Sequence, residues 1–173
     1  MKDLRKNNKG FTLIELIATS MIIFIMSGVA IVGFSSYFSS GRARMLESVG
    51  NQINLARAYS QTQAYPTYIE FRKDESRKQN IAKIYVVISE GNEKTLSEES
   101  VGNAQYTIQY MPADQTAYSK MVDGESTLTL GFNKANCSFK SSDGSCEYAK
   151  SIIVDTEDRV LYLVKETGRT YIE

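Results

Sequence analysis

The sequence "KGFTLIELIATSMIIFIMSGVAIVGFSSYF", Lys9 to Phe38, consists almost entirely of apolar and small residues. No charged residue occurs from Leu16 to Gly41, and this run, built as a helix, reaches about 39 Å at 1.5 Å per residue. The hydrocarbon core of a bilayer is about 30 Å thick, so the length predicts a membrane-spanning anchor. One carboxylate, Glu15, lies within the quoted stretch, directly before this uncharged run and after Phe11, Leu13 and Ile14. An unpaired charge at such a depth costs several kcal/mol, so we expect Glu15 to have a partner.

Basic residues precede the apolar run, in a leader that ends at Gly10. They are Lys2, Arg5, Lys6 and Lys9, against the single acid Asp3. The run is longer than the core of about 7–15 residues in a secretory signal peptide. The basic residues place the N-terminus in the cytoplasm and the rest of the chain outside, although Arg42 and Arg44 weaken the asymmetry. A plain single-span anchor fits the length, but it explains neither Glu15 nor the Lys-Gly end of the leader.

"KGFTLIELI", Lys9 to Ile17, resembles the class III signal of type IV prepilins and of the pseudopilins of type II secretion and competence systems. The resemblance implies that a prepilin peptidase cuts after Gly10 on the cytoplasmic side and that Phe11, the new terminus, is N-methylated. It also implies a single-pass protein of the inner or cytoplasmic membrane, which later enters an extracellular or periplasmic filament. Glu15 would then attract the N-terminal amine of the previous subunit during assembly.

The same resemblance implies the partners. These are other pilin or pseudopilin subunits, the prepilin peptidase, a membrane platform protein, an assembly ATPase, and membrane lipid before assembly. The family commonly has a proline midway along the span, and this sequence has none there, which favours a minor subunit. In addition, "INLARAYSQTQAYPTYIEFR", Ile53 to Arg72, is similar to the helix end and first strand of the minor pseudopilins that initiate filaments.

Helical periodicity continues beyond the apolar run. Residues at spacings of three and four form one stripe: Met45, Val49, Ile53, Ala56 and Ser60. Pro66 disfavours helical geometry at Tyr65, so the helix should end near Gln63. We therefore predict one helix from Thr12 to Gln63, with an amphipathic outer half that lies against a sheet.

After Pro66 the period changes to two. Strands are predicted at Thr67–Arg72, Ala82–Ser89, Ala104–Met111 and Ser126–Phe132, with a hairpin at Ser151–Lys165 that turns near Thr156–Asp158. Polar loops are predicted around Gly91–Gly102 and Pro112–Gly124. "RTYIE", Arg169 to Glu173, is either an edge strand or simply the end of the chain.

These elements predict an α+β fold, in which a long N-terminal helix packs on a small antiparallel sheet domain. The resemblance implies that this fold is pilin-like. Four parts follow along the chain. They are a cleaved leader (1–10), a transmembrane and assembly helix (11–41), its amphipathic continuation (42–64) and an exported β-rich domain (65–173).

Two cysteines, Cys137 and Cys146, enclose "CSFKSSDGSC". A pair that closes a short loop over a Ser-Asp-Gly turn predicts a disulfide in an exported domain. The alternative is two free thiols on adjacent strands of a reduced protein. A metal site is a poor third choice, because the chain has no histidine and no second pair of cysteines.

Composition disfavours catalysis, because the chain lacks histidine, the commonest general acid or base. Asp155, Glu157 and Asp158 are acids, but they lie in a predicted turn where solvated carboxylates are expected. The only candidates for DNA contact, Arg159, Lys165 and Arg169, are sparse. The composition thus indicates no enzyme, cofactor or metal site and gives little support for nucleic-acid binding. The prepilin resemblance implies a structural subunit of a type IV pilus or of a related secretion or DNA-uptake filament. The alternative is a minor pilin that binds a surface, an exoprotein or DNA.

Overall fold

The computed structural model describes residues 12–118, 120–140 and 148–173, and in this part of the chain it contains one helix and nine strands. The elements are α1 (Leu13–Thr62), β1 (Thr67–Asp74), β2 (Gln79–Ser89), β3 (Asn92–Asn103), β4 (Ile108–Pro112), β5 (Lys120–Val122), β6 (Leu128–Phe132), β7 (Ala149–Val154), β8 (Thr156–Val164) and β9 (Arg169–Ile172). The chain divides into two compact units, Met1–Ser40 and Gly41–Glu173. A helix followed by antiparallel strands confirms the predicted α+β class.

The helix begins and ends within one residue of its predicted bounds. All five residues of the predicted stripe, Met45, Val49, Ile53, Ala56 and Ser60, are buried. The last helical bond runs from the Gln63 amide to the Tyr59 carbonyl at 2.9 Å, three residues before Pro66. The last turn of α1 has no basic residue, but Lys134 donates from Nζ to the Ala64 carbonyl at 3.2 Å. This cation comes from a distant loop and complements the negative end of the helix dipole.

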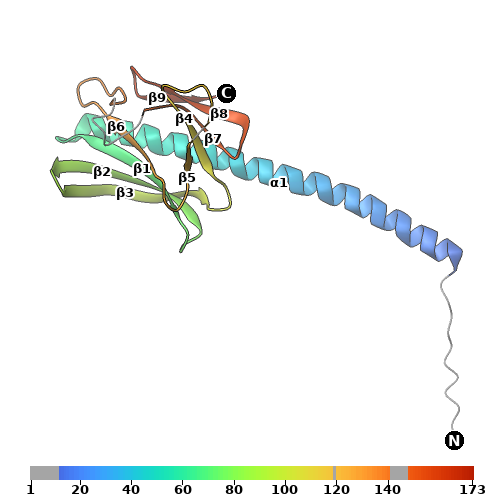
Figure 1. Ribbon diagram of the computed structural model, residues 1–173. Coiled ribbons are helices and arrows are strands. Elements are labelled where there is room, and N and C mark those ends of the chain that lie inside the picture. The colour runs from blue at the N-terminus through green and yellow to red at the C-terminus, as the bar shows by residue number, and fades with distance from the viewer. Residues whose placement is uncertain (1–11, 119, 141–147) are drawn as a thin grey trace, which may run out of the picture. The chain divides into compact units, whose positions relative to one another are not determined.

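The strands form two antiparallel sheets instead of the single sheet expected from the sequence. Their orders are β3-β2-β1-β6 and β5-β4-β7-β8-β9. Within the unit Gly41–Glu173, the end of α1 runs beside both sheets (Figure 1). Side chains from α1 and from both sheets share one hydrophobic core, among them Leu46, Val49, Ile53, Phe71, Ile108, Leu130, Phe132, Ile152 and Leu161. The amphipathic part of α1 thus completes the core of the domain.

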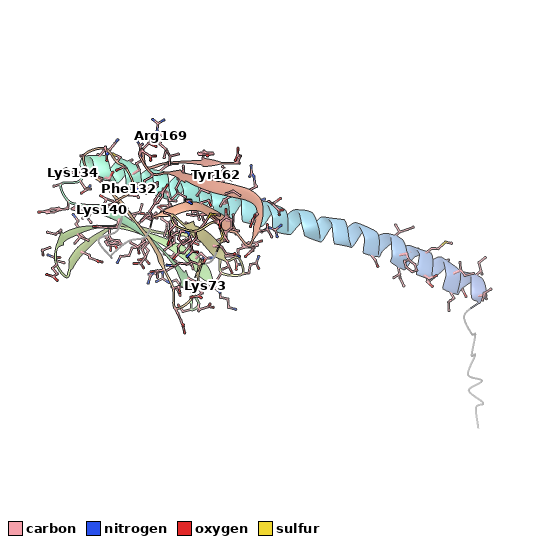
Figure 2. All side chains as sticks on the ribbon, turned by 45° about the horizontal axis from the view of Figure 1, so that its top comes forward. Lys73, Phe132, Lys134, Lys140, Tyr162 and Arg169 are labelled. Atoms are coloured by element: carbon pink, nitrogen blue, oxygen red, sulfur yellow. The ribbon has the colours of Figure 1, made fainter. Side chains whose placement is uncertain are left out.

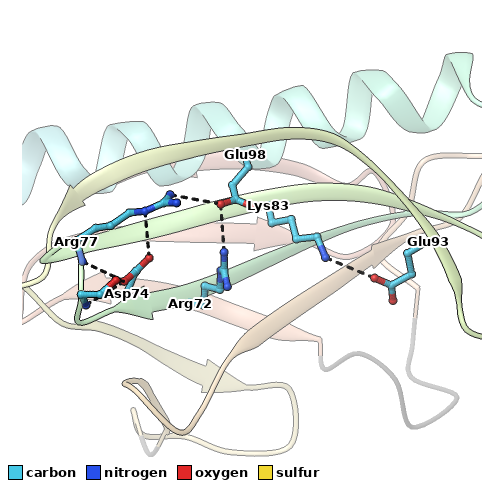
Figure 3. Close-up of polar contacts among 7 residues, drawn as sticks. Arg72, Asp74, Arg77, Lys83, Glu93 and Glu98 are labelled. Carbon is cyan, nitrogen blue, oxygen red and sulfur yellow. Dashed lines mark hydrogen bonds and ion pairs between the residues drawn. The ribbon is translucent and has the colours of Figure 1, made fainter.

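The prediction of a loop around Gly91–Gly102 is wrong, because all of these residues except Gly91 belong to β3. This strand pairs with β2 along most of its length, with Glu98 opposite Lys83. Its many charges suggested a loop, but β3 is an edge strand with an exposed outer side, where charged residues prevent pairing with other chains. Two of these charged residues form ion pairs with other strands of the same sheet, as Figure 3 shows. Glu93 pairs with Lys83 at 3.5 Å, and Glu98 pairs with Arg72 at 3.1 Å.

Three other boundaries differ from the prediction. The predicted strand at Ala104–Met111 begins only at Ile108, because the Asn103 side chain accepts a hydrogen bond from the Gln105 amide at 2.9 Å and forms a turn. The short strand β5 lies inside the predicted loop 112–124. The hairpin β7–β8 turns at Asp155 instead of Thr156–Asp158, because Asp155 takes the left-handed conformation at φ 60°.

A tight approach at Gly168 predicts a large loss of stability on substitution. Gly168 has φ +62°, and a Cβ atom there would collide with the carbonyl oxygen of Cys137. We expect Gly168→Ala to lower the free energy of unfolding by more than the strain of about 1–3 kcal/mol that a left-handed non-glycine residue carries. Gly91→Ala is the matched control, because Gly91 has φ +75° but open space around its Cβ position. Urea unfolding of both variants checks this, and equal losses would contradict a role for the Cys137 contact.

Candidate functional site

The described part of the predicted processing and assembly site is the first turn of α1. Thr12 immediately precedes the helix, and its Oγ1 accepts a hydrogen bond from the Glu15 amide at 3.3 Å. In return, Glu15 Oε2 accepts from the Thr12 amide and from the Thr12 hydroxyl, each at 2.9 Å. This reciprocal arrangement is a capping box, which satisfies amide donors that the first turn of a helix leaves without partners.

The partner of Glu15 is thus partly local. The partner expected from the sequence was the N-terminal amine of another subunit, and the hydrogen bonds to Thr12 were not foreseen. The pattern Thr-x-x-Glu directly before an apolar run was available in "TLIE", Thr12 to Glu15, and predicts a capping box. The negative charge of Glu15 also lies at the positive end of the helix dipole. The carboxylate therefore caps the N-terminus of the helix, and it can still attract a cation from another subunit.

Hydroxyl groups in the following turns bond to the helix backbone. Thr19 donates to the Glu15 carbonyl at 2.8 Å, Ser20 to the Ile17 carbonyl at 2.8 Å, and Ser27 to the Ile23 carbonyl at 2.7 Å. Such bonds satisfy these three hydroxyl groups without water. They suit a helix that enters an apolar environment.

The first unit exposes a dense set of large apolar side chains. They are Leu13, Ile14, Leu16, Ile17, Met21, Ile22, Ile23, Phe24, Ile25 and Met26. Exposed apolar surface of this kind marks contact with a membrane or with another protein. A search of the described residues for a helix with an apolar stretch long enough to cross a membrane gave none.

Several predicted site residues lie outside the described residues. These are the leader, Gly10, Phe11 and Cys146. Cys137 is buried and has a free thiol within the described part of the chain, and its φ of 57° is left-handed. The bridge between Cys137 and Cys146 therefore stays a prediction.

The three acids considered for catalysis have other contacts. Asp155 Oδ1 accepts a hydrogen bond from the Thr107 amide at 2.6 Å, which fixes the hairpin against the start of β4. Asp158 pairs with Arg42 of α1 at 3.3 Å, and Glu157 is exposed. Among the described residues, no group of three or more acids or cysteines is placed to hold a metal ion. The arrangement is that of a stabilised turn.

The three cations considered for DNA contact do not form a common surface. Arg159 pairs with Glu47 of α1 at 3.1 Å. The ammonium group of Lys165 lies 5.6 Å from the centre of the Tyr148 ring. Arg169 is exposed on β9. An electrostatic footprint for nucleic acid needs a continuous basic stripe, and these residues do not supply one.

Comparison with known families identifies the N-terminal segment. Residues 5–31 match the family model of the prokaryotic N-terminal methylation motif. This is the class III signal of type IV pilins and pseudopilins, and the resemblance predicted from Lys9–Ile17 is confirmed. The matched range contains Gly10, Phe11 and Glu15. Searches among curated proteins and among solved structures gave no match.

Proposed function

We propose that this chain is a structural subunit of a type IV pilus or of a related secretion or DNA-uptake filament. The observation that carries the proposal is the methylation motif at residues 5–31, a range that contains Gly10, Phe11 and Glu15 directly before an apolar segment. The exposed apolar side chains of the first unit support it, because they need a membrane or neighbouring subunits to cover them. The compact second unit, with its own core, is the part displayed outside the membrane.

The proposed sequence of events has two stages. The precursor spans the inner or cytoplasmic membrane once, with its leader in the cytoplasm, and a prepilin peptidase removes residues 1–10 and methylates Phe11. The mature helix then leaves the lipid and packs against the helices of other subunits, with the platform protein and the assembly ATPase as the machinery. The motif is that of structural subunits, so this function needs no cofactor, metal or catalytic residue.

The mass of the mature chain tests this proposal. We expect the protein isolated from membranes to begin at Phe11 and to have one added methyl group on its N-terminal nitrogen. Mass spectrometry of the intact chain and of its N-terminal peptide measures both changes. The same chain expressed in cells without a prepilin peptidase is the control and should keep residues 1–10. A mature chain that begins at any other residue would contradict the assignment.

A further inference from the structure

The two sheets have four edges, and three of them are protected. On β3, charged residues and three irregularities in its pairing with β2 oppose addition of another strand. The outer edge of β6 is covered by the segment at Phe139, which bridges to Phe132. β5 has only three residues. The fourth edge strand, β9, has four residues and ends in the β-favouring sequence Thr-Tyr-Ile. In the described part of the chain, it has neither an irregularity in its pairing with β8 nor a segment that covers its outer edge.

The backbone of β9 has hydrogen-bonding groups free for a partner. Glu173 and Val160 exchange both of their backbone bonds, at 2.9 and 3.0 Å. Because bonding alternates along an antiparallel strand, Tyr171 and Arg169 also face β8, whereas Thr170 and Ile172 face away from it. No described residue accepts or donates at the outward amides and carbonyls of Thr170 and Ile172.

A groove lies beside this open edge. Its volume is about 400 Å³, and it is lined on one side by Glu47, Asn51 and Asn54 of α1 and on the other by residues 170–172 of β9. Gly50 keeps α1 close to the sheet here, since a Cβ atom at this position would lie 3.2 Å from Leu161. The edge is therefore accessible, and the helix beside it presents polar amides.

The sequence of β9 identifies the occupant as a second copy of this chain. An antiparallel pair of two such strands centred on Tyr171 sets Arg169 opposite Glu173 of the other copy, at both ends of the pair. Thr170 then lies opposite Ile172, so the four outward backbone groups of each copy meet their complements in the pattern that antiparallel pairing requires. Neither the Arg169 guanidinium nor the Glu173 carboxylate has a side-chain partner among the described residues.

We propose that two copies of this chain associate through antiparallel pairing of their β9 strands. The pair joins two five-stranded sheets into one. Tyr171, which is 52% exposed, stacks on Tyr162 with ring centres 5.2 Å apart, on the same face as Arg169 (Figure 2 labels Tyr162 and Arg169). In the pair, the two Tyr171 side chains become neighbours in a non-hydrogen-bonded position, where cross-strand aromatic contacts are favourable.

The direction of β9 fixes the relative direction of the helical segments that pack beside it. Thr167 contacts Arg57 and Thr170 lies near Gly50, so β9 runs opposite to this part of α1. Antiparallel pairing of β9 therefore turns the α1 segments of the two second units, from Gly41 onward, in opposite directions. The strand pairing does not depend on the proposed function.

Disulfide trapping of the full chain in detergent micelles tests the strand pairing. One short strand makes a weak contact, and trapping captures weak contacts. We expect Tyr171→Cys to give a disulfide-linked dimer under mild oxidation, because opposed Cβ atoms in such a pair lie about 4.5–5.5 Å apart. Lys94→Cys, on the protected edge strand β3, is the matched control and should give no more dimer than the native cysteines of the parent chain. Equal trapping at both positions would overturn the proposal.

Charge reversal supplies the second arm of the test. Adding Arg169→Glu to the Tyr171→Cys chain sets two like charges opposite each other at both ends, and we expect the dimer yield to fall several-fold. Adding Glu173→Arg to that chain exchanges the charges and should restore the yield. The assigned register is contradicted if Arg169→Glu alone leaves the dimer yield unchanged. It is also contradicted if the added Glu173→Arg does not restore the yield. Failure of N-terminal processing would instead contradict the proposed function and would leave the trapping result unchanged.

Discussion

Replacing Gly10 with valine should leave the whole population of the chain uncut. Gly10 is the last residue of the leader and lies inside the matched methylation motif. Glycine has no side chain, so the chain can approach a peptidase closely at this position, and a branched side chain prevents that approach. We expect a precursor that still enters the membrane, since the apolar run is unchanged. Mass analysis should find residues 1–10 still attached and no methyl group on Phe11.

Gly28→Val is the matched control for this experiment. It introduces the same side chain into the apolar part of α1, where nothing lies within 4 Å of the Cβ position. Processing of this variant should be normal. Normal trimming of the Gly10→Val chain would show that cleavage occurs elsewhere, and loss of trimming in both variants would indicate a general defect of the helix.

The parts of the fold that repeat with a simple period could be predicted from the sequence. The helix was predicted to within one residue at each end, because its stripe of apolar residues and Pro66 are both local features. The sequence alone does not decide whether residues 169–173 form an edge strand or only the end of the chain, and the structure shows an edge strand, β9. β3 was missed, because the charges that protect an edge strand are the same residues that are typical of a loop.

The division into two sheets could not be predicted in this way. Period-two patterns identify a strand and its buried face, but they say nothing about which strands pair. In this chain β6 pairs with β1 across more than fifty residues, and β7 lies between β4 and β8. Which strands pair depends on tertiary packing, because side chains of α1 and of both sheets fill one shared core. The methylation motif could be recognised from the sequence because it is contiguous, although the cap between Thr12 and Glu15 was missed.

The largest effect on assembly is expected from Glu15→Val. We propose that the carboxylate attracts the N-terminal amine of the previous subunit, and opposite charges attract far more strongly in an apolar setting than in water. Removing one member of a buried ion pair costs about 3–5 kcal/mol, which is a change of more than a hundredfold in an association constant. The variant should enter the membrane and be cut after Gly10. It should not co-purify with partner subunits or appear in filaments.

The capping box supplies the controls that separate this charge from the start of the helix. Glu15→Gln keeps a side-chain oxygen that accepts from the Thr12 amide, but it removes the charge, so it should fail in assembly as the valine variant does. Thr12→Ala removes the hydroxyl cap, at a cost of about 1 kcal/mol to the helix, but keeps the charge, so it should assemble. Quantitative blotting of isolated filaments against total membrane protein measures all three variants. Assembly of Glu15→Gln at the parent level, with failure of Glu15→Val, would assign Glu15 to the cap alone, because both variants lack the charge and only glutamine keeps the hydrogen-bond acceptor of the cap.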